Sequence, residues 1–269
     1  MSDQAEAVDD TALPLAGRHA LVTGGGRGIG AAIAVELARL GADLTLTGRS
    51  ESHLDVTATE INDRYQVRVA ICPMDISIET AVRDTVAFAA DKLGPPTILI
   101  NNAGVAPAGP FEDLDLEIWR HAFGVNVEGV FLCTHAVLNG MRDAGWGRIV
   151  NIASTAGLTA YPHVAAYVAS KHAVVGLTRA LALELARTGV TVNAVCPGYT
   201  ETDMAQGAID NLVAAGRSEA EARKLLAKKN PQGRLVQPDE VAQAVGWLCL
   251  PSSGAVTGQA IAVAGGEVM

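Results

Sequence analysis

Cysteine is scarce in this chain of 269 residues, which has only four of them, far apart. No two stand in a C-x-x-C pair or at another spacing typical of metal ligands, so neither a metal site nor a disulfide framework is predicted. We expect them to be small buried hydrophobic residues: Cys72, Cys133, Cys196 and Cys249.

Basic charge is also in short supply, since 20 lysines and arginines stand against 29 aspartates and glutamates, a formal net charge of −9. This balance argues against nucleic acid or an anionic membrane as the main partner. The start, MSDQAEAVDD, is acidic and lacks the apolar core of a secretory signal. No run of about 18 apolar residues occurs, because the longest candidate is broken by Arg179 and Glu184. We therefore expect a cytoplasmic protein without a membrane partner.

Aromatic residues make up only 4% of the sequence, whereas hydrophobic residues reach 49%. Buried parallel strands covered by helices of small residues use such a composition. Short apolar runs alternate with helical patterns, which predicts one α/β domain with a parallel sheet, right-handed crossovers and helices on both faces. Strands are expected at about 19–23, 43–47, 67–72, 97–101, 148–153, 191–196 and 260–264, and helices at about 28–40, 51–63, 79–93, 115–143, 164–187 and 238–250.

Two segments fall outside this alternation. Residues 1–16 are predicted to be a flexible tail, so that the single domain spans 17–269. Residues 203–230 have helical character without a neighbouring strand, and we expect them to form a mobile helical lid over the substrate. Ligands in such folds bind beyond the carboxyl ends of the strands, so the chemistry is expected there.

The first strand leads into a glycine-rich turn, TGGGRGIG, and then into a helix. Gly24, Gly28 and Gly30 have G-x-x-x-G-x-G spacing, which permits a tight turn. It also lets backbone N–H groups approach a pyrophosphate at the positive end of the helix. Between a strand and a helix this loop predicts dinucleotide binding; the alternative is a plain structural turn.

The end of the second strand indicates which dinucleotide is bound. Gly48 occupies the position at which an acidic residue would hold a ribose 2′-hydroxyl, Arg49 follows it, and Arg27 lies in the glycine loop. Guanidinium groups bind a 2′-phosphate through charge-assisted hydrogen bonds, whereas a carboxylate there would repel it. We therefore expect NADP(H) rather than NAD(H), unless Arg49 merely solvates the strand end.

Seven motifs occur along nearly the whole chain, and in their order and spacing the sequence resembles the short-chain dehydrogenase/reductase family. They are TGGGRGIG (23–30), MDI (74–76), NNAG (101–104), GVNVEG (124–129), NIAST (151–155), YVASK (167–171) and CPGYTETDM (196–204). The resemblance implies a Rossmann-type doubly wound domain with a seven-stranded parallel sheet of order 3-2-1-4-5-6-7. It also implies a homotetramer and an enzyme that transfers hydride between a nicotinamide and a carbonyl or secondary alcohol.

The resemblance also implies which residues hold the cofactor. Asp75 would bind the adenine amine, and Asn102 would line the adenosine ribose while bracing the central sheet. With the glycine loop and the two arginines, the predicted cofactor contacts are Gly24, Arg27, Gly28, Ile29, Gly30, Arg49, Asp75, Ile76, Asn102, Ala103, Gly104, Tyr167, Lys171, Pro197, Gly198, Thr200 and Thr202.

Tyr167 and Lys171 are four positions apart, so on a helix they lie one above the other. By resemblance, Ser154 would bind the substrate carbonyl, Tyr167 would pass it a proton, and Lys171 would lower the tyrosine pKa. Moving that pKa toward neutrality takes roughly 4 kcal/mol, which a cation about 4 Å away supplies only in a partly dehydrated cleft. Asn126 would help hold a water that links the lysine to solvent, unless it only makes a helix–helix hydrogen bond.

Of the predicted properties, the substrate is the one that the sequence determines least. Within the family, the segments ELARTGVTVNAVCPGYTETDM and GRLVQPDEVA look most like 3-oxoacyl-thioester reductases and polyketide ketoreductases. A small-molecule or acyl-thioester carbonyl is therefore expected, and the acidic chain slightly favours CoA thioesters or free ketones over an acidic carrier protein. A dehydrogenase of cyclic, aromatic or other secondary alcohols is the alternative. A non-catalytic dinucleotide-binding protein is more remote, because it would not need the Ser–Tyr–Lys–Asn set.

Overall fold

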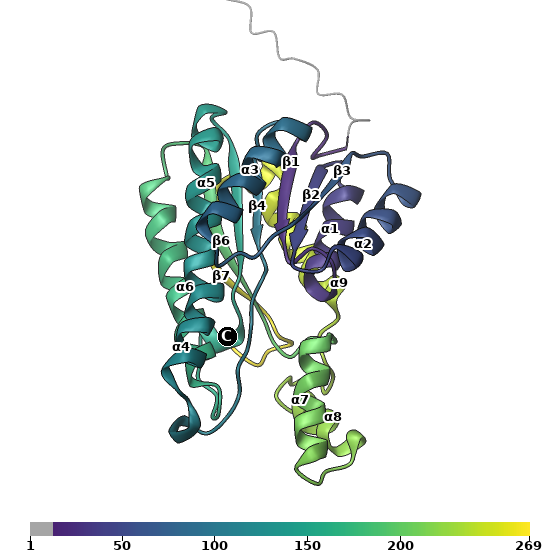
Figure 1. Ribbon diagram of the computed structural model, residues 1–269, viewed down its shortest axis with the longest axis vertical. Coiled ribbons are helices and arrows are strands. Elements are labelled where there is room, and N and C mark those ends of the chain that lie inside the picture. Colours follow the sequence, from purple (N-terminus) through teal and green to yellow (C-terminus); the bar gives the residue numbers. More distant parts are fainter. Residues whose placement is uncertain (1–12) are drawn as a thin grey trace, which may run out of the picture.

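The computed structural model describes residues 13–269 of the chain. Parallel strands form one seven-stranded sheet in the order β3-β2-β1-β4-β5-β6-β7, with helices on both faces (Figure 1). The strands are β1 His19–Thr23, β2 Asp43–Gly48, β3 Val69–Pro73, β4 Ile98–Asn101, β5 Gly147–Ile152, β6 Val190–Pro197 and β7 Ala260–Val263. The predicted fold class and strand order are confirmed.

The helices cover the sheet in two layers, with α1 packed against α9 in one and α3 against α5 in the other. They are α1 Gly28–Arg39, α2 Glu51–Arg64, α3 Glu79–Leu93, α4 Leu116–Phe123, α5 Gly129–Asp143, α6 Ala165–Glu184, α7 Asp203–Ala214, α8 Glu219–Ala227 and α9 Pro238–Cys249. None of the helices between residues 13 and 269 is long and apolar enough to cross a membrane.

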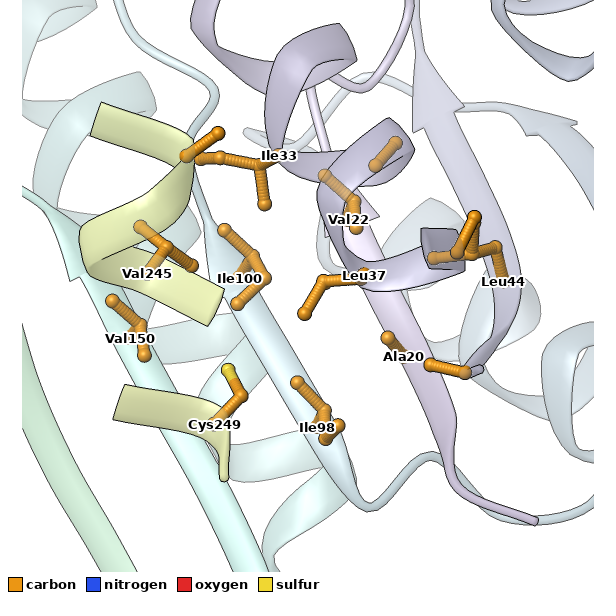
Figure 2. Packing of buried hydrophobic residues seen from close by; sticks show 14 of the residues in the cluster. Ala20, Val22, Ile33, Leu37, Leu44, Ile98, Ile100, Val150, Val245 and Cys249 are labelled. Atoms are coloured by element: carbon orange, nitrogen blue, oxygen red, sulfur yellow. The ribbon is translucent and has the colours of Figure 1, made fainter. Parts of the chain in front are cut away.

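The central strands bury side chains on both faces of the sheet. Ile100 of β4 lies in the core with Leu37 of α1 and Val245 of α9 (Figure 2). Its neighbour Leu99 lies in the core of the opposite layer, with Val137 of α5. Successive side chains of a strand point to opposite faces, so a strand that is covered on both sides must be apolar throughout. This explains the continuous apolar run ILI that predicted β4.

The structure changes one predicted helix. The segment expected as a single helix over 115–143 is divided into α4, a π-helical turn at Gly124–Glu128, and α5. A π turn widens the helix by one residue, and such turns are frequent at functional sites. This one contains Asn126, whose buried side chain bonds the backbone of Val105 outside the helix.

The boundary of the predicted tail also moves. Its first residues, 1–12, lie outside the described part of the chain. Leu15, which the prediction placed in the tail, is fully buried, and its N–H donates to the carbonyl oxygen of Leu40 at 2.9 Å. The folded unit therefore begins before residue 17, because Leu15 completes the core beside α1.

The segment predicted as a lid, 203–230, forms the helices α7 and α8. The two helices pack on one another around a small core of their own that includes Ile209 and Leu226. In Figure 1 this hairpin, the lid from here on, projects from the body at the end toward which the loop between β4 and α4 also runs. It therefore lies beyond the carboxyl ends of the strands.

Candidate active site

The glycine loop joins β1 to α1 at the carboxyl end of the sheet. Gly24 has φ 66° and Gly28 has φ 55°, a left-handed conformation that side chains other than glycine rarely adopt. Gly30 has no such φ, but a Cβ there would overlap the carbonyl oxygen of Gly24. The loop and the first turn of α1 can therefore approach each other only with glycine at this position.

The start of α1 offers donors to an anion. Among the described residues no side chain caps this helix, whose N-cap is Arg27, and its first turn contains no acidic residue. The first N–H groups of a helix have no partner within the helix, and the positive end of the helix dipole favours negative charge. Gly28, Ile29 and Gly30 thus fit a pyrophosphate, as predicted from the sequence.

Asn102 connects the glycine loop to β4. Its Nδ2 donates to the carbonyl oxygens of Thr23 (2.9 Å) and Gly24 (3.2 Å). In return, the hydroxyl of Thr23 accepts from the backbone N–H groups of Asn102 (2.9 Å) and Ala103 (3.1 Å). These bonds fix the carboxyl ends of two neighbouring strands, so the bracing expected of Asn102 is present and its contact with a ribose stays a prediction.

Asp75 and Ile76, predicted to meet the adenine, follow β3. The Asp75 carboxylate accepts from the hydroxyl (2.6 Å) and N–H (2.9 Å) of Ser77, and these bonds, with a smaller contribution from Arg49, lower its pKa. Asp75 is therefore ionised at neutral pH and can accept from an amine. Ile76 is buried against Gly129, where a Cβ would overlap its side chain.

The two arginines predicted to select the 2′-phosphate differ in their surroundings. Arg49 is exposed at the end of β2. Arg27 donates to the carboxylate of Asp203, the first residue of α7, at 3.1 Å, although their side chains are 62% and 76% exposed. An ion pair this exposed contributes little to stability, so a phosphate group could take the place of Asp203.

The four residues predicted to be catalytic come together from three elements. Ser154 begins the turn after β5, Tyr167 and Lys171 lie on α6, and Asn126 lies in the π turn. The Lys171 Nζ is 5.6 Å from the centre of the Tyr167 ring. A Cβ at Gly104 would lie 3.2 Å from Asn126 Oδ1 and 3.6 Å from Lys171 Nζ, so these two groups flank the same glycine.

Burial controls the protonation of this group. Lys171 is only 5% exposed and donates to the carbonyl oxygen of Ile152 at 2.7 Å; burial lowers its pKa to about 8. Burial also raises the pKa of Tyr167, and a hydrogen bond with Ser154 acts in the opposite direction. Desolvation of the phenol is the largest of these effects, and a lowering of the tyrosine pKa by Lys171 stays a prediction. A phenol that keeps its proton can act as an acid.

Asn126 is fully buried and bonded on both sides of its amide. Its Oδ1 accepts from the N–H of Val105 at 2.9 Å, while Nδ2 donates to the carbonyl oxygen of Val105 and to the hydroxyl of Ser170, each at 2.9 Å. The bond to Ser170 is the helix–helix bond that sequence reasoning gave as the alternative. It does not exclude the water link, because Oδ1 has a second lone pair.

The segment after β6 is predicted to hold the nicotinamide half. Pro197 is the last residue of β6, and the Thr200 hydroxyl donates to the carbonyl oxygen of Gly198 at 3.0 Å. The Thr202 hydroxyl donates to the carbonyl oxygen of Thr200 at 3.1 Å, and Thr202 caps α7. The hydroxyls of this segment thus hold its own backbone, which leads directly into the lid.

A hydrogen-bond chain beside the site was not found from the sequence. Tyr161 Oη lies 2.7 Å from Glu267 Oε1 and 2.8 Å from the hydroxyl of Thr155, the residue after Ser154. A carboxylate only accepts, so Tyr161 donates to Glu267 and accepts from Thr155. Within the described residues, the other oxygen of Glu267 is buried without a partner. No local pattern connects Glu267 with Ser154, since they are far apart in the chain.

A cavity of about 340 Å³ opens on the substrate side, between the loop after β4 and the turn before α6. His163 lines it and has φ 64°, the only positive φ of a residue other than glycine among those described. Its carbonyl oxygen accepts from the N–H of Gly109 at 2.8 Å, which joins the two walls. The cavity is otherwise lined mainly by Pro107, Ala108, Pro110, Leu114, Ile118 and Ala166.

Comparison with known proteins agrees with this geometry. A protein of Streptomyces violaceoruber, named as a granaticin polyketide synthase ketoacyl reductase, is 44% identical over 251 residues, which cover 92% of each chain. An acetoacetyl-CoA reductase of Rhizobium meliloti is 38% identical over 250 residues, 93% of this chain and 98% of that protein. A crystal structure of an actinorhodin polyketide ketoreductase with NADPH superimposes with a TM-score of 0.89 and 42% identity, over 93% of this chain and 97% of the other.

The family model described as short chain dehydrogenase matches residues 18–212, from the start of β1 to within α7. That range includes the glycine loop, the π turn and the Ser154, Tyr167 and Lys171 side chains. The chain belongs to the short-chain dehydrogenase family.

Proposed function

We propose that this protein is an NADPH-dependent reductase of 3-oxoacyl thioesters. One observation carries the proposal: Ser154 hydrogen-bonds a half-buried Tyr167 that keeps its proton, with Lys171 on the same helix, at the carboxyl end of the sheet. The family membership and the similarity to reductases of ketoacyl and acetoacetyl-CoA substrates support it.

In the proposed reaction Ser154 and Tyr167 act on the carbonyl oxygen of the substrate. Bound NADPH would supply the hydride. The Ser154 hydroxyl donates a hydrogen bond to the carbonyl oxygen and positions it, and Tyr167 gives the same oxygen a proton as general acid. Because burial raises the pKa of Tyr167, the phenol holds that proton at neutral pH. Oxidation of a secondary alcohol, the alternative, would use the same residues in reverse, with the phenolate of Tyr167 as base.

Lys171 would return the proton to Tyr167. Its pKa of about 8 lies near the working pH, where an acid–base group exchanges protons most effectively. Asn126 Oδ1 and the Lys171 Nζ flank Gly104, so a water that uses the second lone pair of Oδ1 would lie beside the ammonium. We infer that Asn126 holds this water in place and that Lys171 receives its protons from solvent through it.

Arg49 and Arg27 would select NADPH over NADH. Arg49 is exposed just after β2 and Arg27 is the N-cap of α1, and we expect the adenosine ribose to lie between these two elements. Arg27 would exchange Asp203 for the 2′-phosphate, which links cofactor binding to the start of the lid.

The homotetramer expected from the family is also part of the proposal. α5 and α6 each expose an apolar side chain, Phe131 at 54% and Leu183 at 81%. Packing of these helices against a partner would remove both from water. A single monomeric peak in size-exclusion chromatography would argue against it. The cytoplasmic location stays a prediction.

The proposed function is tested by following NADPH absorbance with 3-oxoacyl-CoAs, cyclic ketones and secondary alcohols, using both cofactors. We expect turnover of 3-oxoacyl-CoA with NADPH. Arg49→Asp should raise the KM for NADPH at least tenfold, about 1.4 kcal/mol, with a much smaller change in kcat. Arg142→Asp, an exposed arginine at the other end of the sheet, is the matched control. Turnover of alcohols alone would contradict the proposal.

A further inference from the structure

Lysine is rare in this chain and most of it is in one place. The whole sequence has five lysines. Lys171 belongs to the site, Lys92 lies on α3, and the other three, Lys224, Lys228 and Lys229, lie at the end of α8 and just beyond it. Three of five lysines within six residues are unexpected for a helix that only needs a polar outer face.

The charge around these lysines is opposite to that of the protein. Between residues 217 and 234 there are six lysines and arginines but only two acidic residues, Glu219 and Glu221, a local net charge of +4 in a chain of −9. An anion approaching the protein is therefore repelled by most of the surface and attracted by residues 217–234.

The arginines of this segment are largely occupied, whereas the lysines are not. Arg223 bonds both oxygens of Glu201 at 2.7 Å, and Arg234 bonds Glu240 at 2.6 Å. Within residues 13–269 no carboxylate lies within 4 Å of the three lysine ammonium groups, which are exposed. The unneutralised charge of the lid is thus carried mainly by the end of α8.

Two of the lysines repel one another. Lys224 and Lys228 are four positions apart on or at the end of one helix, so they lie on the same face, and like charges at this spacing destabilise a helix. The helix dipole favours cations in the last turn, which offsets part of this cost. That dipole effect is the alternative explanation, and it predicts an effect on stability alone.

Lys229, Lys228 and Lys224 connect the neighbourhood of Ser154 with the lid. Lys229 Nζ lies 5.5 Å from the centre of the Tyr161 ring, and the Tyr161 hydroxyl bonds Thr155, the residue after Ser154. Lys228 is the C-cap of α8 and Lys224 lies in its last turn. α8 belongs to the hairpin that projects from the body (Figure 1). A long substrate with its keto group at Ser154 could pass Tyr161 and Lys229 and extend along α8.

We infer that the end of α8, with Lys224, Lys228 and Lys229, binds the phosphate groups of a pantetheine-linked thioester; this rests on the proposed function. In such a substrate the acyl group is neutral and the phosphates lie at the far end of the pantetheine arm. Lysine suits a phosphate as a compact point charge with three donors. The phosphate can come from CoA or from an acyl carrier protein. This modifies the expectation, drawn from the net charge alone, that an acidic carrier is disfavoured.

The test compares substrates with and without phosphate in the double variant Lys224→Gln, Lys228→Gln. For acetoacetyl-CoA we expect a KM about tenfold higher at low salt, with kcat changed less than twofold. For the acetoacetyl thioester of N-acetylcysteamine, which has no phosphate, we expect no change in kcat/KM. Acetoacetyl-acyl carrier protein is the third substrate, and Lys92→Gln is the control variant.

The outcomes separate this inference from the proposed function. A higher KM with either carrier supports the inference and identifies the source of the phosphate. An unchanged KM with both carriers, or an equal rise with the phosphate-free thioester, overturns it. Calorimetry measures the binding of CoA and, separately, of pantetheine, which has no phosphate, to the unaltered protein and to the variant. If the unaltered protein reduced no thioester, the proposed function would fail, and CoA binding that does not depend on the two lysines would overturn the inference as well.

Discussion

The glycine loop and the lid meet at the Arg27–Asp203 ion pair, but different interactions hold them in place. The loop is fixed by buried backbone contacts, with Gly30 against Gly24 and Asn102 bonded to the end of β1. The lid packs around a small core of its own, and its connections to the body include exposed ion pairs such as Arg223–Glu201.

The glycine loop and the lid therefore differ in how much change they tolerate. A buried polar group that loses its partner costs about 1–3 kcal/mol, so the cofactor side tolerates little change. An exposed ion pair contributes at most about 1 kcal/mol, so the lid can change its contacts at small cost. We therefore expect the glycine loop to tolerate less change than the lid. Each prediction below tests this division.

The largest effect is expected at Tyr167, the predicted proton donor. Tyr167→Phe keeps the ring but removes the proton, so turnover should fall by about 10²–10⁴, or roughly 3–5 kcal/mol. The dissociation constant for NADPH should stay within threefold, because the glycine loop is untouched. Tyr65→Phe, at the end of α2, is the matched control. Normal turnover in the Tyr167→Phe variant would remove the basis of the proposed mechanism.

The next effect concerns the buried charge of Lys171. The native pKa is about 8, against about 10.5 in the unfolded chain. Below pH 8 both states hold the proton, and the cost of the buried charge is fully present. Between pH 8 and 10.5 the native state releases its proton while the unfolded state keeps it, so the free energy of unfolding rises with pH.

Lys171→Met should remove this rise. Urea unfolding at pH 7.5 and pH 10 should show the unaltered protein gaining about 2–3 kcal/mol relative to the variant. Lys228→Met, an exposed lysine of the lid, should leave the pH dependence as it is, because its charge is solvated in both states. Equal pH profiles for all three proteins would show that Lys171 is not desolvated.

The smallest effect is expected when glycine is replaced by alanine, once in the glycine loop and once in the lid. Gly30→Ala places a Cβ on the carbonyl oxygen of Gly24 and should cost about 1–3 kcal/mol of unfolding free energy and weaken NADPH binding. Gly207→Ala, in α7, meets no atom within 4 Å and should stabilise the protein by about 0.5–1 kcal/mol. Urea unfolding and NADPH titration measure both. A loss of stability in both variants would contradict the division between a rigid and an adaptable side.

Most of the fold could be predicted from the sequence because its elements have strong local patterns. The apolar runs located the seven strands to within about two residues, and family resemblance supplied their order. The π turn at residues 124–128 was not predicted, because it accompanies a contact with a segment outside the helix. Its inward-facing Asn126 bonds Val105, a residue 21 positions away.

The motifs predicted the site, and the structure brings together the four residues that are predicted to be catalytic. What the sequence did not reveal depends on contacts between distant segments. Glu267 bonds Tyr161, which is 106 positions away in the chain. The three lysines at the end of α8 indicate a binding site only because the fold places Lys229 beside Tyr161. The desolvation that raises the pKa of Tyr167 could not be predicted, because spacing gives the distance between two charges but not how far water is excluded from them.

The sequence by itself determined the local geometry: the glycine turn at the start of α1, the alternating strands and helices, and the placement of Tyr167 above Lys171 on one helix. These follow from backbone sterics and from the 3.6-residue period, which act over a few residues. Only the tertiary structure decided the direction of the pKa shifts of Tyr167 and Lys171, the surroundings of Asn126 and the position of the lysines at the end of α8. Those properties depend on how water is excluded when distant segments pack together, and no short stretch of the chain contains that information.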